Sequence, residues 1–141
     1  MKTLQTLTAA FLITFSMSAF AAGEPNNKRF IMTYAVETYI DAMTNGDIKE
    51  LPALLDSDVK FSSTRANKVV TFNKSEIVQS LKDIENVKQN CVSSYKVLEQ
   101  NQAQALIKVS MKYKDFTKVN YVTMENTSNG WKITNVSSSY N

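Results

Sequence analysis

The sequence has no histidine, and that absence excludes more chemistry than any other feature of its composition. Its 141 residues also include only one cysteine, three glycines and two prolines. Without histidine, the chain lacks the usual general base near neutral pH, the commonest metal ligand and the usual partner of serine or cysteine nucleophiles. A single cysteine excludes an internal disulfide, a zinc ribbon and CxxC redox chemistry. The composition therefore predicts no His-based catalytic centre, no metal site and no cofactor.

The excess of positive charge is also small, and almost all of the basic residues are lysines. The chain has 16 Lys and Arg against 13 Asp and Glu, a formal net charge of +3, and its only arginines are Arg29 and Arg65. Proteins that bind nucleic acid or anionic membranes concentrate positive charge on one surface, and phosphate sites favour arginine. We therefore expect no nucleic-acid partner, and no membrane partner once any export signal is removed. At this length a single domain is expected.

The first 21 residues have the pattern of an export signal. Lys2 gives a positive start, residues 4–20 are mostly apolar, and residues 19–21 (Ala-Phe-Ala) fit a small-x-small cleavage site. The alternative is a buried N-terminal helix. The only cysteine, Cys91, is far from the cleavage site, so a lipid anchor is not expected.

This pattern divides the chain into three parts. We expect a signal peptide at residues 1–21, a disordered lead-in at residues 22–27 and one domain at residues 28–141. The protein would be exported, to the periplasm or out of the cell, and would not be a lipoprotein.

Three helices are expected in the first half of the domain. Residues 28–44 repeat apolar side chains at three- and four-residue spacing, and Asn-Gly at 45–46 would end that helix because glycine readily adopts the left-handed conformation. Residues 47–50 have the pattern of a capping box for a second, short helix, whose first turn Pro52 would distort. The same pattern at residues 73–76 predicts the start of a third helix.

Strand patterns occupy most of the remaining chain. Two short candidates, 59–63 and 69–72, precede the third helix. The long candidates after it are residues 91–99, 103–114, 118–127 and 131–140, and apolar and polar residues alternate strictly in the second of them. A change of apolar parity between Ile133 and Val136 indicates a bulge near Thr134. Helices that precede a run of antiparallel strands indicate an α+β fold, with the sheet packed on three N-terminal helices.

The order of these elements and three sequence segments resemble the nuclear transport factor 2-like superfamily, which includes ketosteroid isomerase, scytalone dehydratase and many polyketide cyclases. The segments are Tyr-Ile-Asp-Ala-Met-Thr-Asn-Gly-Asp at 39–47, the stretch from 51 to 61 with Asp-Val-Lys-Phe at its end, and Gly-Trp-Lys-Ile-Thr-Asn-Val at 130–136. Within the superfamily, the chain is most similar to small exported proteins grouped as "putative lumazine-binding". The resemblance covers residues 28–141.

This resemblance implies a cone-shaped half-barrel. Its helices would close one end of a strongly curved antiparallel sheet and leave an apolar cavity at the other end. It also implies a homodimer. It specifies the fold more closely than the activity, because this fold hosts many unrelated functions.

The resemblance to ketosteroid isomerase is incomplete at the residues that would do its chemistry. Its pocket tyrosine corresponds to Tyr39, but its general base would fall near Ser63 and its oxyanion-hole acid near Tyr121 or Val122. None of these last three is a carboxylic acid, and the histidine of dehydratase-type members is missing. Isomerase chemistry needs a base and a pair of donors that hold the enolate. We therefore expect no catalytic residues.

Eight residues are candidates for the wall of the expected cavity. They are Tyr39, Met43, Phe61, Arg65, Met111, Tyr113, Tyr121 and Trp131. Core packing remains an alternative role for the aromatic and apolar members, and a solvated turn for Arg65, which could otherwise reach an anionic ligand at the cavity mouth. The lysines expected on the solvated face of the sheet are Lys108, Lys112, Lys114 and Lys118.

The function expected from these features is an exported, non-catalytic domain that binds a small apolar or aromatic molecule in a cone cavity, or a partner protein on its sheet. The alternative is a cofactor-free enzyme of isomerase, cyclase or dehydratase type, which would need carboxylates in the cavity. Glu37, Asp41, Asp115 or Glu125 buried against Tyr39 would favour that enzyme. A third alternative is a structural or dimerisation module with a filled core.

Overall fold

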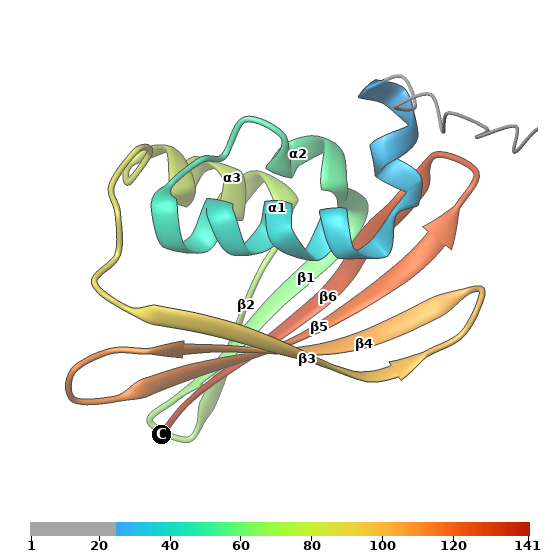
Figure 1. The fold of residues 1–141 in the computed structure, drawn as a ribbon. Helices are drawn as coiled ribbons and strands as arrows, with labels where there is room; N and C mark the ends of the chain where they lie inside the picture. Colours follow the sequence, from blue (N-terminus) through green and yellow to red (C-terminus); the bar gives the residue numbers. More distant parts are fainter. Residues whose placement is uncertain (1–24) are drawn as a thin grey trace, which may run out of the picture.

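A single sheet runs through the domain and carries the helices on one face (Figure 1). The computed structural model describes residues 25–141; the expected export signal lies outside the described residues. The six strands are hydrogen-bonded in the order β2 (Lys68–Phe72), β1 (Leu55–Arg65), β6 (Gly130–Tyr140), β5 (Thr117–Thr127), β4 (Gln104–Lys112) and β3 (Val92–Gln100), and the sheet is curved and unclosed. The expected α+β fold is therefore confirmed. Within residues 25–141, no helix is long and apolar enough to span a membrane.

The first helix lies close to its expected position. A 3₁₀ helix, η1 (Pro25–Phe30), precedes α1 (Met32–Asn45), so residues 25–27, expected in a disordered lead-in, belong to η1. Gly46 ends α1 in the left-handed conformation, with a φ of 71°. The Asn-Gly pair predicted this ending, because glycine adopts positive φ without steric cost.

The second helix is shorter than expected and begins later. α2 spans Leu51–Leu54, and no side chain caps its start, so the capping box expected at residues 47–50 does not form. Pro52 lies in the first turn of α2, where its missing N–H leaves no helical hydrogen bond unmade. Strand β1 (Leu55–Arg65) follows at once and therefore begins before Val59, where the alternation in the sequence placed it.

The other strands match the expected pattern closely. They are β2 (Lys68–Phe72), β3 (Val92–Gln100), β4 (Gln104–Lys112), β5 (Thr117–Thr127) and β6 (Gly130–Tyr140). Every pair of sheet neighbours is antiparallel except β1 and β6, which are parallel. The expected bulge is confirmed, because Ile133 pairs with Met124 and Asn135 pairs with Thr123, which leaves Thr134 as the extra residue.

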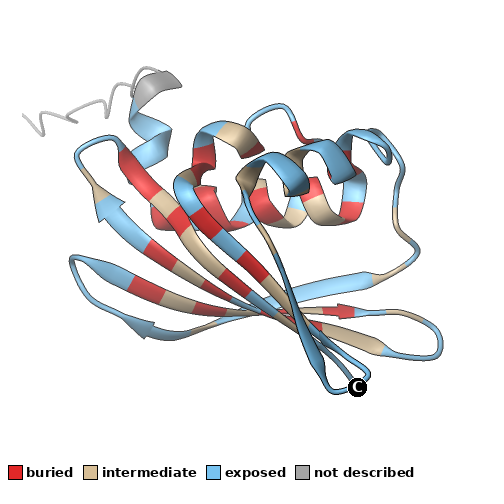
Figure 2. Ribbon diagram, turned by 180° about the vertical axis from the view of Figure 1, so that it is seen from behind, coloured by how far each residue is buried: buried red, intermediate tan, exposed pale blue. Residues whose placement is uncertain are grey.

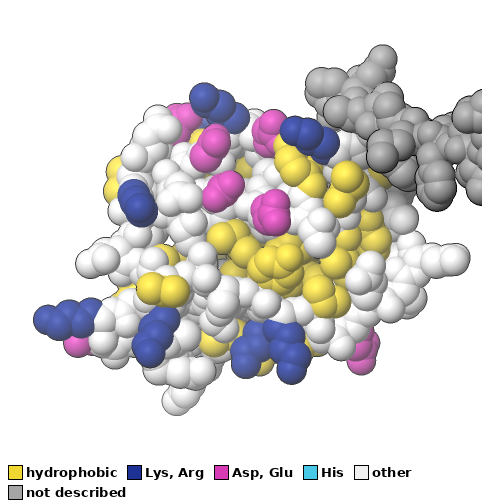
Figure 3. All heavy atoms as spheres, in the orientation of Figure 1, with side chains coloured by type: hydrophobic (Ala, Val, Ile, Leu, Met, Phe, Trp, Pro, Cys, Tyr) yellow, Lys and Arg dark blue, Asp and Glu magenta, His cyan; other side chains and the backbone are white. Residues whose placement is uncertain are grey.

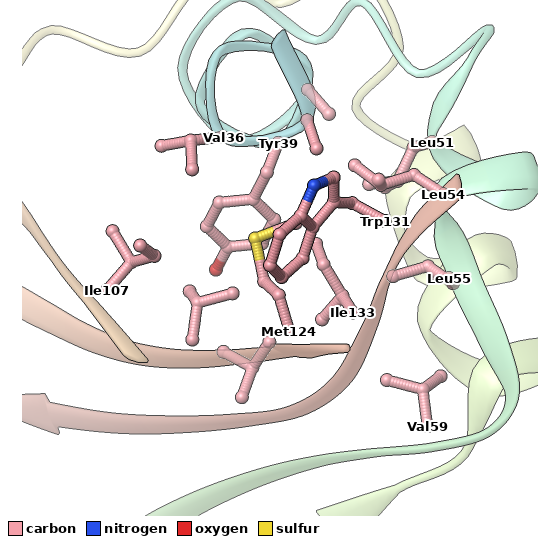
Figure 4. Packing of buried hydrophobic residues seen from close by; sticks show 14 of the residues in the cluster. Val36, Tyr39, Leu51, Leu54, Leu55, Val59, Ile107, Met124, Trp131 and Ile133 are labelled. Atoms are coloured by element: carbon pink, nitrogen blue, oxygen red, sulfur yellow. The ribbon is translucent and has the colours of Figure 1, made fainter. Parts of the chain in front are cut away.

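The core lies between the helices and the face of the sheet that they cover, called the inner face below (Figure 2). Buried and more exposed residues alternate along the central strands. In β4 the buried side chains are Ala105, Ile107, Val109 and Met111. Figure 4 shows Tyr39 from α1, Met124 from β5 and Trp131 from β6 pointing into this core.

The helices leave the β3 edge of the sheet uncovered. Tyr95 of β3 pairs with the buried Val109 and so shares the inner face, yet 39% of Tyr95 is exposed. Figure 3 shows hydrophobic side chains gathered between the helices and the sheet on this side of the molecule. The inner face is thus better covered at its centre than at this edge.

Candidate functional site

A cavity of about 670 Å³ is lined by residues of α1, of α3 (Lys74–Lys82) and of the inner face of the sheet. This volume lies in the usual range for small-molecule sites. The aromatic side chains that line it are Tyr39, Phe61, Phe72, Tyr113 and Tyr140. Among the apolar side chains that line it are Met43, Ile77, Leu81 and Met111. We call this space the cone cavity.

The cone cavity brings together six of the eight residues expected in its wall. They are Tyr39, Met43, Phe61, Arg65, Met111 and Tyr113. Their part in ligand binding stays a prediction. Trp131 is buried in the core, but it lines a different hollow of about 560 Å³ beside α1 and α2.

Tyr121 lies outside the cone cavity, and the expectation that it faces inward is wrong. It pairs with Lys108 on the outer face, and 38% of it is exposed. Val122 and Met124 are buried on the inner face of β5, and strand alternation then places Tyr121 on the opposite face. The sequence carried this signal, because Tyr121 alternates with those two apolar residues.

Tyr39 lies at the inner end of the cone cavity, on the apolar face of α1. It is 1% exposed, and the side chain of Asn120 lies beside its hydroxyl. Burial raises the pKa of Tyr39 above its usual value, and the polar side chain of Asn120 lowers it only in part. Tyr39 therefore stays neutral and keeps its proton through the physiological range.

Asn120 is a buried polar residue that the sequence analysis did not single out. It is 1% exposed, and its Oδ1 accepts a hydrogen bond of 2.7 Å from the Ser138 hydroxyl. Its Nδ2 is 4.0 Å from the sulfur of Met111, which is a weak acceptor. The signal available in the sequence is that Asn120 is in phase with the apolar residues Val122 and Met124, so strand alternation places this polar residue on the inner face.

Tyr113 stands in the wall of the cone cavity, just beyond β4. Its ring is stacked on Phe116, with ring centroids 4.6 Å apart and an interplanar angle of 13°. Its hydroxyl donates to Oε1 of Gln89 at 3.4 Å. Burial raises the pKa of Tyr113, and the neighbouring Cys91 and Tyr140 raise it further. Like Tyr39, it offers the cavity a neutral hydroxyl.

Helix α3 (Lys74–Lys82) forms one side of the cone cavity and is fixed at its start by the expected capping box. The side chain of Asn73 accepts from the backbone N–H of Glu76 at 3.0 Å, and the Glu76 carboxylate accepts from the backbone N–H of Asn73 at 2.8 Å. Of the described residues that line the cavity, Glu76 alone carries a carboxylate. That carboxylate is therefore already engaged by the backbone.

The carboxylates that would favour an enzyme do not lie in the cone cavity. Those expected to decide the question are Glu37, Asp41, Asp115 and Glu125, and all four are exposed. Within residues 25–141, no group of three or more His, Cys, Asp or Glu side chains could hold a metal ion. Cys91 is half-buried and unpaired by any disulfide.

Comparison with known proteins relates this architecture to a family of domains. A profile of the family described as "putative lumazine-binding" matches residues 27–140. Comparison with curated proteins gives no match. An NTF-2 like protein of unknown function from Silicibacter pomeroyi has 17% identity and a TM-score of 0.65, with 78% of this chain and 92% of that chain covered.

Two further solved structures give the same result. An NTF2-like protein from Cytophaga hutchinsonii has 17% identity and a TM-score of 0.61, with 80% of this chain and 98% of that chain covered. A cystatin-like fold protein from Burkholderia xenovorans has 17% identity and a TM-score of 0.62, with 83% and 93% covered. At these identities, the structural similarity establishes the fold alone. The profile match spans most of the chain, and the chain therefore belongs to the family described as "putative lumazine-binding".

Proposed function

We propose that this protein binds a small apolar or aromatic molecule in the cone cavity, without catalysing a reaction, after export to the periplasm or out of the cell. The observation that carries the proposal is the cavity itself: about 670 Å³, with five aromatic rings in its wall. Cavities of this size and lining suit small molecules whose flat surface can pack against rings. The family description also supports a small-molecule ligand.

An enzymatic function has less support. Tyr39 lines the cavity, and its hydroxyl could donate a hydrogen bond to a bound oxygen. Isomerase-type chemistry also needs a base that removes a proton, and Glu76, the carboxylate in the wall, is held by the backbone of Asn73. A binding function explains the cavity without requiring a catalytic base.

The binding proposal can be tested with N-phenyl-naphthylamine, a neutral aromatic probe that fluoresces in apolar sites. We expect saturable binding at one site per chain, and displacement by lumazine or another small aromatic compound. In Met43→Trp, the added indole would occupy space on the α1 side of the cavity, so the probe should bind at least about tenfold more weakly. Thr33→Trp is the matched control, because Thr33 is exposed on the same helix and outside the cavity wall.

Native mass spectrometry of protein purified from its own source would give an independent answer. It would show a retained small molecule and, in the same spectrum, whether the chain forms the homodimer that the resemblance implies. An intact mass equal to that of a chain that begins near residue 22 would show that the signal peptide had been removed and would support export. Ligand-free protein that also gives no saturable probe binding would overturn the binding proposal, as would equal probe affinity in Met43→Trp and the unchanged protein.

A further inference from the structure

The inner face of the sheet changes from apolar to polar along neighbouring strands β1, β6 and β5. The register aligns Phe61 of β1 with Val136 of β6, and Val136 with Val122 of β5, in a wholly apolar row. Both valines are at most 2% exposed. This row is the apolar end of a gradient in polarity along the inner face, and it lies nearer the core than the rows that follow.

The next row of inner-face residues along these three strands, further from the core, is polar. It consists of Ser63, Ser138 and Asn120, which are aligned by the same register. The Ser63 hydroxyl oxygen is buried and has no hydrogen-bond partner among the described residues. An unpaired buried hydroxyl is unfavourable, so a bound molecule that hydrogen-bonds to it would gain affinity. Ser63 and Ser138 line the cone cavity, and this part of its wall therefore suits a polar atom within a ligand's ring system.

The third row carries positive charge and lies at the cavity mouth. Lys118 of β5 pairs with Tyr140 of β6, and its Nζ is 5.9 Å from the centre of the Tyr140 ring. Arg65 lies two residues beyond Ser63 on the same strand, and so on the same face. Arg65 and Tyr140 are exposed, whereas the apolar row is buried. The gradient thus runs from an apolar interior to a cationic opening.

The position of Lys118 differs from that of the other lysines of the sheet. It was expected on the solvated face with Lys108 and Lys112. The register instead pairs Lys118 with Met111, a buried inner-face residue, while Lys112 pairs with Thr117 on the outer face. Lys118 is half-buried and lines the cone cavity. A solvated outer face therefore does not explain this lysine.

The charges in the cavity wall are unbalanced. Its cations are Arg65 and Lys118, and its one carboxylate, Glu76, accepts the backbone N–H of Asn73 at 2.8 Å. The cations are therefore available to a ligand, and a cationic ligand would be repelled.

We infer that the ligand of the cone cavity is an aromatic molecule with one anionic group, such as a carboxylate or sulfonate. Its rings lie against the aromatic and apolar wall, and its anionic group lies at the mouth between Lys118 and Arg65. This inference rests on the proposed binding function and adds to it the chemical class of the ligand.

The test compares two probes that share one ring system and differ by a single charged group. Anilinonaphthalene sulfonate carries a sulfonate, and N-phenyl-naphthylamine lacks it. We expect the folded protein to bind the sulfonate more tightly, with a preference that weakens as salt is added. In Lys118→Gln, affinity for the sulfonate should fall by about tenfold or more, the usual effect of losing one hydrogen bond to a charged group. Affinity for the neutral probe should fall by a much smaller factor, so the preference for the sulfonate is lost.

Lys112→Gln is the matched control, because it removes one lysine from the outer face of the same sheet. It should leave both affinities unchanged. Arg65→Gln should act in the same direction as Lys118→Gln. Equal affinity of the unchanged protein for both probes, or loss of sulfonate affinity by the same factor in Lys112→Gln and Lys118→Gln, would overturn the anion site while the binding function stood. Failure of both probes to bind would overturn the binding function itself.

Discussion

The Ser138 hydroxyl donates a hydrogen bond of 2.7 Å to Oδ1 of Asn120, across neighbouring strands β6 and β5. Asn120 is 1% exposed and lies among apolar residues. This contact therefore satisfies the acceptor of a buried amide that water does not reach. It also fixes the orientation of the amide, whose nitrogen is left on the side of Met111 and Tyr39.

Ser138→Ala should lower the free energy of unfolding by about 1–2 kcal/mol, because it leaves the Asn120 oxygen buried without a partner. Urea denaturation followed by circular dichroism measures this loss. Ser139→Ala is the control, because Ser139 is exposed on the other face of β6. If both variants lost the same stability, the hydrogen bond would not be the cause.

Replacing both partners should cost less than removing one. Made in the Tyr39→Phe background, which removes the hydroxyl beside Asn120, the double variant Ser138→Ala with Asn120→Leu removes the serine hydroxyl and the buried amide together, so none of these polar atoms is left unpaired. We expect it to be more stable than Ser138→Ala alone in the same background. A loss equal to the sum of the two single variants would show that the two residues act independently.

Tyr39 should make the protein less stable at high pH. An unfolded tyrosine ionises near pH 10, but burial raises the pKa of Tyr39 in the folded protein. Above about pH 10 the unfolded chain therefore holds fewer protons than the folded protein, and stability falls as pH rises. Below that pH the residue is neutral in both states and contributes no pH dependence.

Tyr39→Phe should remove this part of the alkaline loss. The slope of unfolding free energy against pH above pH 10 should become shallower by up to about 1.4 kcal/mol per pH unit, the value for one proton. Denaturation at a series of pH values measures the slope. Tyr121→Phe is the control at an exposed tyrosine. An unchanged slope in Tyr39→Phe would contradict the burial of an ionisable hydroxyl at this position.

Gly46→Ala should destabilise the protein by at least about 2 kcal/mol. Gly46 has a φ of 71°, and a Cβ there would lie 2.6 Å from the backbone nitrogen of Asn86 and 2.8 Å from the backbone oxygen of Ile84. These are backbone atoms, which cannot rotate away. Thermal unfolding measures the change. Asn45→Ala, at an exposed neighbour, should change stability by less than about 0.5 kcal/mol, and a similar effect at both positions would contradict this explanation.

Features of the fold that depend on a few consecutive residues could be predicted from the sequence, and features that depend on distant residues could not. The left-handed Gly46, the capping box at Asn73 and the bulge at Thr134 were all predicted, because each depends on a few consecutive residues. The capping box expected at residues 47–50 does not form. Strand β1 instead begins at Leu55, which pairs with Ile133, and that partner is far away in the sequence.

For the residues of the site as well, local sequence patterns predicted some positions correctly and others wrongly. Tyr39 could be placed in a cavity wall because it lies on an apolar helix face in a segment that resembles a known family. Tyr121 was assigned to the wrong face, and Lys118 was assigned to the solvated face. Alternation along β5 indicates that Tyr121 lies opposite Val122 and Met124 and that Lys118 shares their face, but pairing with β4 and β6 decides that this face points inward.

By itself, the sequence determined the C-terminal end of α1 and the start of α3, the alternation of the long strands, and the lack of any histidine for catalysis or metal binding. These features follow from local backbone preferences and from the chemistry of the side chains present. Only the tertiary structure decided that β1 lies in parallel beside β6. That pairing sets Ser63 beside Ser138 and Asn120, because hydrogen bonds between strands distant in the chain fix a register that no local pattern encodes.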